Sequence, residues 1–204
     1  MSISEKMQHI DYSKSIEDQL DSLSLFDDIT DSEIEELFDW HKSSEAGILL
    51  EYLGPVRLQK YLPQFLQFLQ DINWPGAGGA ARMISAAGAT ALPEIRRVFR
   101  EENDSTWKDW IILAILQEWN TELVASLKPE LIHIIQKPDS EAASTSAFKI
   151  LVENGLLTAE EKSTLYQQLR QAYAVMQYNW GGDWWPTYQA SLLVDLDEVM
   201  QEAP

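Results

Sequence analysis

The sequence contains no cysteine, which excludes disulfides, thiolate metal sites and a thiol nucleophile. No apolar run approaches the roughly 18–20 residues that a membrane-spanning helix requires. The first residues, 1–6, lack the basic and apolar regions of a secretory signal. Basic residues are scarce, with 15 Lys+Arg against 33 Asp+Glu, and such a charge balance repels phosphate backbones and anionic lipid. We therefore expect a cytoplasmic protein that binds neither nucleic acid nor membranes.

The acid that is present is concentrated at one end of the chain. Residues 1–53 hold 14 Asp/Glu and 3 Lys/Arg, whereas residues 54–157 are nearly neutral and residues 158–204 carry a net charge of −5. The hydrophobic fraction of 45% is typical of a globular protein. The acidic end is expected to attract basic partners, although acidic helices can also serve solubility alone.

Three similar sequence motifs, called phrases below, recur in the middle of the chain. They are Leu62–Leu69, Leu92–Phe99 and Leu127–Ile135, and each places a proline in its first turn before apolar residues at helical spacing. A second apolar segment follows each phrase. Helix pairs of this length that recur every 30–40 residues are typical of HEAT-like repeats, and no segment alternates apolar and polar residues as a strand does. The sequence predicts an all-α fold, a HEAT-like α-solenoid of stacked helical hairpins in a single domain.

Four parts follow from this pattern: a flexible N-terminus over residues 1–12, acidic helices over 13–54, a HEAT-like repeat core over 55–157, and Trp-rich C-terminal capping helices over 158–204. Thr30 and Glu33 form a capping-box pattern that predicts the start of a helix, and Thr158–Glu161 is another capped start. Ser44 is expected to cap a third helix, which Gly54-Pro55 ends, and Asp104 or Ser105 is expected to cap the helix near 105–119. Helices are expected near 13–25, 30–42, 44–54, 58–72, 76–87, 91–101, 105–119, 128–136, 140–153, 158–176 and 187–202.

Few motifs suggest chemistry. Gly76–Ala81 matches the loose dinucleotide pattern G-x-G-x-x-A, but that function needs a preceding strand, and the segment before it has a helical stripe. Small residues there are better explained by close helix packing. The histidines, His9, His41 and His133, have no partner at the spacing of a metal pair, and no nucleophile is paired with a base. We therefore expect no catalytic residues, no metal and no cofactor.

Tryptophan is unusually frequent, with 8 in 204 residues. Trp74 and Trp107 follow inter-helix turns and are expected to be partly exposed, whereas Trp110 and Trp119 are expected in the core. Trp180, Trp184 and Trp185 share a glycine-containing segment with Asp183. These side chains either cap the end of the fold or form a recognition patch, since tryptophan is enriched among interface anchors.

Residues from about 45 to 157 resemble a family of small, mostly bacterial, HEAT-like domains of unknown function. The resemblance rests on the Gln-Asp-x-Asn-Trp-Pro phrase at Gln70–Pro75, and on Leu92–Ile95, Thr106–Trp110 and Lys128–Leu131. It covers about half of the chain. It implies an all-helical fold and supplies no activity.

These observations favour a non-catalytic protein-binding module. Its most concrete form is a cytosolic immunity protein that neutralises a basic toxin, such as a nuclease effector, because an acidic inhibitor can occupy a groove that binds phosphate. The alternatives are an adaptor that binds a peptide or helix in its groove, and an enzyme. The sequence does not determine the oligomeric state. The predicted partner-binding residues are Asp27, Asp28, Asp31, Glu35, Glu36, Asp39, Trp74, Trp107, Trp180, Asp183 and Trp184.

Overall fold

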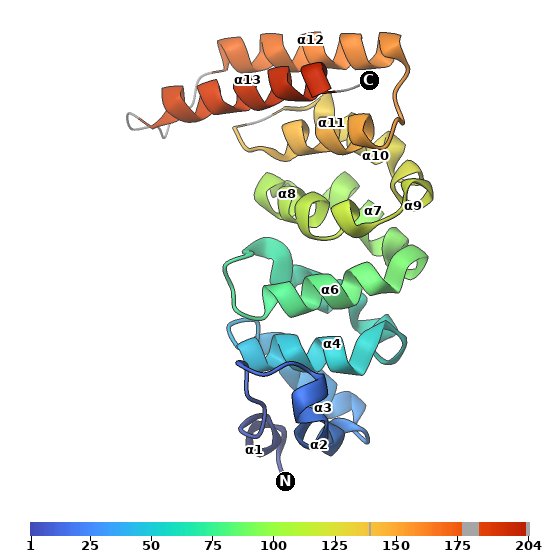
Figure 1. The fold of residues 1–204 in the computed structure, drawn as a ribbon, viewed down its shortest axis with the longest axis vertical. Helices are drawn as coiled ribbons and strands as arrows, with labels where there is room; N and C mark the ends of the chain where they lie inside the picture. The colour runs from blue at the N-terminus through green and yellow to red at the C-terminus, as the bar shows by residue number, and fades with distance from the viewer. Residues whose placement is uncertain (139, 177–183, 203–204) are drawn as a thin grey trace. The chain divides into compact units, whose positions relative to one another are not determined.

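The computed structural model describes residues 1–138, 140–176 and 184–202. Every regular element among these residues is a helix, and no strand occurs among them, so the predicted all-α class is confirmed (Figure 1). The chain forms two compact units, Met1–Glu94 and Ile95–Pro204. The boundary between them falls inside the range 55–157 that the sequence predicts to be one repeat core.

The N-terminal unit is built from short helices and 3₁₀ turns. Its α-helices are α1 (Ile3–Met7), α2 (Leu20–Leu23), α3 (Asp31–Glu36), α4 (Ser44–Leu58), α5 (Leu62–Leu66) and α6 (Ala77–Ala87). Its 3₁₀ turns are η1 (Glu17–Gln19), η2 (Ser24–Phe26), η3 (Leu37–Asp39), η4 (Gln59–Tyr61), η5 (Gln67–Gln70) and η6 (Gly88–Ala91). Fully buried side chains from these elements form its core, among them Leu23, Phe26, Ile34, Leu37, Leu49, Leu50, Leu58, Phe65 and Leu69.

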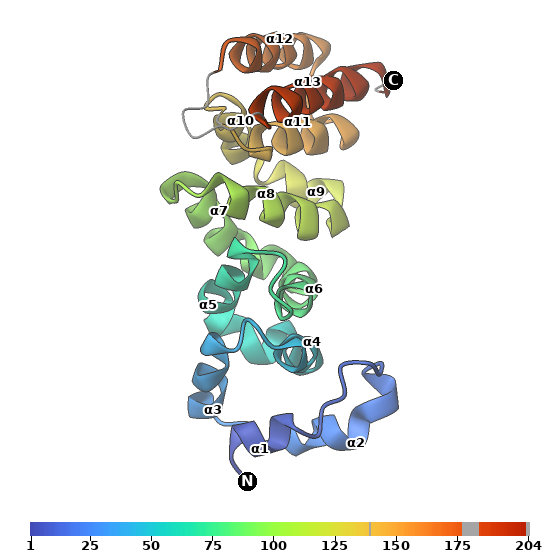
Figure 2. The ribbon, with the colours of Figure 1, turned by 90° about the vertical axis from the view of Figure 1, so that its left-hand side faces the viewer.

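The C-terminal unit begins within α7 (Leu92–Glu101). It continues with α8 (Ser105–Ala114), η7 (Leu116–Glu118), α9 (Thr121–Ala125), α10 (Lys128–Ile135), α11 (Ala143–Glu153), α12 (Ala159–Val175) and α13 (Trp185–Glu202). Helix α11 packs on α8, α10, α12 and α13 and is the central helix of this unit. Both views show α12 and α13 side by side (Figures 1 and 2). A buried hydrogen bond from Thr145 Oγ1 to the Tyr173 hydroxyl, 3.2 Å long, joins α11 to α12.

Helix starts follow the predicted caps closely. Capping boxes at Thr30 and Thr158 are confirmed. Helix α4 is capped one residue earlier than the expected Ser44, because the side chain of Ser43 accepts a hydrogen bond from the backbone N–H of Ala46 at 3.2 Å. An N-cap residue has an extended backbone and bonds the N–H three residues on, and Ser43 meets both conditions.

The predicted stop at Gly54-Pro55 is present as a break within α4. Gly54 has a φ of 71° and a ψ of 170°, which no helical residue adopts, and Pro55 starts the next turn. The sequence predicts a flexible terminus over residues 1–12, whereas the structure has helix α1 there. Ser2 and Glu5 form a capping box at its start, and Ile3 and Met7 are buried.

Helices α4 and α6 lie side by side with their backbones in contact (Figure 1). A Cβ atom added to Gly79 of α6 would stand 2.1 Å from the carbonyl oxygen of Gly47 in α4. Only a residue without a side chain allows this approach. The glycines of the Gly76–Ala81 motif therefore serve helix packing. The element before them is the 3₁₀ turn η5, so the strand that a dinucleotide site requires is missing at this place.

Candidate functional site

Several of the predicted acidic residues lie on α3 and η3 of the N-terminal unit, where the capping box fixes the start of the helix. Thr30 Oγ1 accepts a hydrogen bond from the Glu33 backbone N–H, and the Glu33 carboxylate accepts one from the Thr30 backbone N–H at 2.9 Å. Lys6 Nζ lies 2.9 Å from the same carboxylate. The backbone hydrogen bond from Thr30 and the ion pair with Lys6 lower the pKa of Glu33 to about 2. Glu33 is therefore ionised, and its charge is engaged within the N-terminal unit by the capping box and by Lys6.

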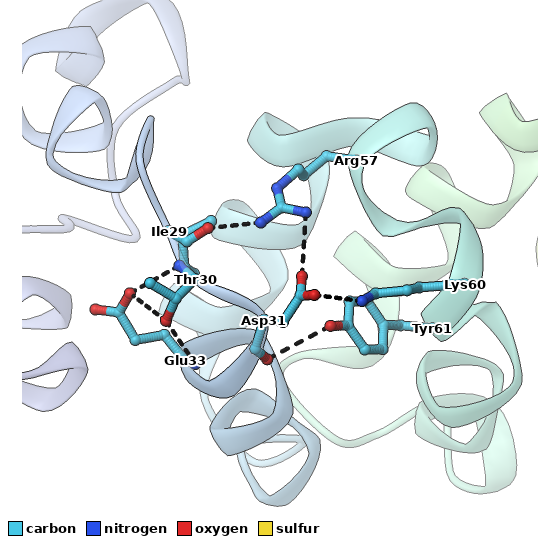
Figure 3. A network of polar contacts seen from close by, with 7 residues as sticks. All are labelled: Ile29, Thr30, Asp31, Glu33, Arg57, Lys60 and Tyr61. Atoms are coloured by element: carbon cyan, nitrogen blue, oxygen red, sulfur yellow. Dashed lines mark hydrogen bonds and ion pairs between the residues drawn. The ribbon is translucent and has the colours of Figure 1, made fainter.

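Asp31 is likewise engaged inside the unit (Figure 3). Its carboxylate is paired with Lys60 through one oxygen and lies 3.3 Å from Arg57 Nη1 through the other. The hydrogen bond from Lys60 is the largest cause that lowers the pKa of Asp31. Arg57 also donates to the carbonyl oxygen of Ile29 at 2.6 Å. These contacts join the start of α3 to the segment around η4, and the charge of Asp31 is matched within the chain.

The remaining predicted carboxylates differ in how they are engaged. Asp27 accepts a hydrogen bond from the hydroxyl of Tyr52, which raises the pKa of that hydroxyl. Asp28, Glu35, Glu36 and Asp39 are exposed, and within the described ranges none of them forms an ion pair. Three of these four, Glu35, Glu36 and Asp39, belong to the continuous segment formed by α3 and η3. This segment presents negative charge to solvent that no lysine or arginine of the unit offsets directly.

Asp39 also lines a cavity of about 280 Å³ in the same unit. The other lining residues are aromatic rings or carboxamides: Phe38, His41, Gln64, Gln67, Phe68, Gln70 and Trp74. The structure thus brings together two of the predicted site residues, Asp39 and Trp74, which are 35 positions apart in the sequence. We call these eight residues the aromatic cavity.

The rings of the aromatic cavity are held by neighbouring rings and by backbone bonds. The ring centroids of His41 and Trp74 are 4.2 Å apart, and those of His41 and Phe68 are 6.0 Å apart in an edge-to-face arrangement. The carbonyl oxygen of His41 accepts a hydrogen bond from the backbone N–H of Gly76 at 3.0 Å. Gly76 permits this close approach, because a Cβ there would stand 2.9 Å from the same oxygen. A backbone hydrogen bond therefore joins the segment before α6 to the turn after η3, and the Trp74 ring lies tilted against the His41 imidazole.

The three glutamines of the aromatic cavity come from one stretch, α5 and η5. Gln67 and Gln70 are exposed, whereas Gln64 is half-buried and its Oε1 atom is shielded from solvent. That oxygen accepts no hydrogen bond from any described residue. Buried acceptors are nearly always hydrogen-bonded. An acceptor without a partner can therefore take a hydrogen bond from a ligand. Sequence reasoning missed these residues, although their spacing of three places them along one side of a helical segment.

The tryptophans of the C-terminal unit differ in their exposure. Trp107 is only 3% exposed, so the predicted partial exposure of this side chain is wrong. Trp107 lies close to a turn in the sequence, but its ring faces the core of the C-terminal unit. Trp119 is buried as predicted, whereas Trp110, which was also expected in the core, is only half-buried. Trp184 is 48% exposed and its ring meets the edge of the buried Trp185. Trp180 and Asp183 lie outside the described residues.

The small basic cluster of α7 has partners within the C-terminal unit. Arg96 Nε lies 3.1 Å from Glu130 Oε1, and Arg100 bonds the same oxygen. Arg97 lies 2.7 Å from Glu102. Glu130 is almost fully buried on α10, so it joins α10 to α7 through two guanidinium groups.

None of the helices in the described part of the chain combines the length and the apolar character needed to cross a membrane. Nor do three His, Cys, Asp or Glu side chains of the described residues gather in an arrangement that could hold a metal ion.

The chain is thus an all-helical protein whose N-terminal unit carries an aromatic cavity with a carboxylate on its lining. Residues 48–149 match the family described as a domain of unknown function (DUF5071). Because this match spans half of the 204 residues, the chain belongs to that family. The predicted resemblance to a family of unknown function is confirmed. Comparison with curated proteins and with solved structures gave no significant match. Gln64, Phe68 and Trp74 fall inside the matched range, whereas Asp39 and His41 precede it.

Proposed function

We propose that this chain is a non-catalytic protein-binding protein, and most concretely an immunity protein of the bacterial cytoplasm that neutralises a basic toxin such as a nuclease. We further propose that its helix pairs are HEAT-like repeats. Proline-started helices that pack on a following helix, as α10 packs on α11, support this arrangement. Repeats of this kind commonly provide binding surfaces.

One observation carries the proposal. Asp28, Glu35, Glu36 and Asp39 are exposed without an ion pair in the described part of the unit, whereas Glu33 and Asp31 beside them are paired. The free carboxylates belong to a unit that also has three half-buried aromatic rings, Phe38, His41 and Trp74, and the buried ring of Phe68 around a cavity. Exposed charge steers a partner of opposite sign, and aromatic side chains anchor it once it has arrived.

The physical mechanism is inhibition by occupation. A nuclease needs a basic groove to hold the phosphates of its substrate. An acidic surface that docks on that groove competes with the nucleic acid and needs no chemistry of its own. Electrostatic attraction accelerates such an encounter, and this matters for an inhibitor that must reach the toxin before the substrate does.

The direct test is to mix the purified chain with a basic nuclease encoded beside its gene, at low salt. We expect a complex at micromolar concentrations and loss of the nuclease activity. Absence of a complex under these conditions would contradict the immunity proposal. A complex that forms equally well when the free carboxylates are neutralised would favour the adaptor alternative, in which a groove binds a peptide or helix and the acid serves solubility.

A further inference from the structure

The aromatic cavity combines three kinds of group that recognise one type of ligand. Aromatic rings attract a cation placed over their faces. The carboxylate of Asp39 supplies an opposite charge, and the lining includes no lysine or arginine that would neutralise it. The carboxamides of Gln64, Gln67 and Gln70, which line the cavity, supply hydrogen-bond acceptors.

We propose that the aromatic cavity receives an arginine side chain of the basic partner. A guanidinium group is planar, stacks on aromatic rings, and offers five N–H donors to acceptors in its plane. The shielded Oε1 of Gln64, which no described residue bonds, is an acceptor for one of these donors. Asp39 is an acceptor for a charge-assisted bond to the same group.

The size of the cavity agrees with one side chain. Its volume of about 280 Å³ lies just below the range for small-molecule sites, about 300–1,000 Å³. A cofactor or a folded peptide would need more room. A lysine ammonium fits less well, because it is a compact, strongly hydrated charge with no flat face to stack.

This inference deepens the proposed function, since it names the group of the partner that the N-terminal unit recognises. It also explains the pairing pattern of the acidic residues. Asp31 is occupied by Lys60 and Arg57, whereas Asp39 has no ion pair in the described part of the chain and stands at the aromatic cavity.

The test uses the full chain and three short peptides, acetyl-Gly-Arg-Gly-amide and its lysine and citrulline counterparts. Citrulline has the shape of arginine without the charge. Binding is followed by the NMR signals of the Trp74 indole N–H and the Gln64 side-chain amide. We expect saturable shifts with the arginine peptide and a dissociation constant on the order of 1 mM, as suits a single side chain. The lysine peptide should bind several-fold more weakly, and the citrulline peptide should not saturate.

Two variants and a matched control locate the site. Asp39→Asn should weaken binding of the arginine peptide about tenfold, which is the usual effect of losing a charged hydrogen-bond partner. Gln64→Met, which removes the acceptor but keeps the chain length, should weaken it several-fold. Asp28→Asn is the control, because it removes the same charge from an exposed residue outside the aromatic cavity. It should leave the dissociation constant within about twofold.

Three results would overturn the inference: equal binding of the citrulline peptide, equal effects of Asp39→Asn and Asp28→Asn, or no saturable shift of Trp74 at concentrations about tenfold above the expected dissociation constant. The outcome can be told apart from that of the proposed function. A basic partner that binds while the peptides do not refutes the arginine site alone. Peptide binding without any basic partner supports the site and refutes the immunity proposal.

Discussion

The contact between Gly47 and Gly79 gives the sharpest prediction about stability. A methyl group at position 79 would stand 2.1, 2.3 and 2.5 Å from the O, C and Cα atoms of Gly47. All three are backbone atoms, so no side-chain rotation can relieve the clash. Helices α4 and α6 would have to separate by more than 1 Å to restore an ordinary contact of 3.4–4 Å.

The magnitude follows from two opposing terms. Overpacking of this kind costs typically 1–3 kcal/mol and sometimes more, and the separation also weakens dispersion contacts along the two helices. Replacement of glycine by alanine inside a helix returns about 1 kcal/mol. Because the obstructing atoms are rigid, we expect a cost at or above the upper end of this range, about 3–5 kcal/mol, and hence a net loss for Gly79→Ala of about 2–4 kcal/mol.

Urea unfolding followed by circular dichroism measures this loss. Gly78→Ala is the matched control, since its methyl group would meet only the tip of the flexible Arg82 side chain at 3.5 Å. That variant should be as stable as the parent or up to about 1 kcal/mol more stable. If the two variants unfold at the same urea concentration, the close approach of α4 and α6 is wrong.

Two further predictions concern single side chains. The folded pKa of Glu33 is about 2, below its ordinary value of 4.5, so the stabilisation is present above pH 4.5 and is lost as the pH falls from 4.5 to 2. Glu33→Gln should therefore be less stable than the parent at pH 7, by at most about 3 kcal/mol. The difference in unfolding free energy between the two proteins should disappear near pH 2. A difference that does not change with pH would contradict the lowered pKa of Glu33. Glu130→Gln removes the buried partner of Arg96 and Arg100 and should cost about 1–3 kcal/mol in a thermal or urea unfolding experiment. Glu122→Gln, an exposed change in the same unit, should stay within about 0.5 kcal/mol, and equal effects of the two would show that the buried pair does not stabilise the unit.

Features that depend on neighbours within four residues could be predicted from the sequence. The caps at Thr30 and Thr158 and the break at Gly54 depend on local hydrogen bonds and backbone angles. Asp104 at the start of α8 belongs to the same group, because its side chain accepts from the N–H of Trp107 at 2.9 Å.

One local feature was missed. The predicted helix at 105–119 ends at Ala114, where Ile115 leaves the helical region with a φ of −120°, and the short helix α9 follows with Asn120 as its cap.

Features that depend on distant parts of the chain were also missed. The role of Glu130 as the shared partner of two arginines depends on the packing of α10 beside α7. The burial of Trp107 depends on which side of α8 meets the core, which its distance from a turn does not reveal.

The candidate site was found only in part for the same reason. Asp39 and Trp74 could be chosen from charge and residue type. The contribution of Gln64, and the tilted contact between the Trp74 and His41 rings, required the fold that brings η3, α5 and the segment before α6 together.

The proposal of charge-driven partner binding is tested most directly by association kinetics with a basic nuclease encoded beside the gene of this chain, at two salt concentrations. The triple variant Asp28→Asn/Glu35→Gln/Glu36→Gln neutralises exposed, unpaired carboxylates without touching the paired ones. Glu118→Gln/Glu122→Gln/Glu160→Gln removes the same charge from the C-terminal unit. The first variant should associate more slowly than the parent and lose much of its salt dependence, whereas the second should behave like the parent. Identical rates for both variants would contradict the assignment of partner binding to the acidic surface of the N-terminal unit.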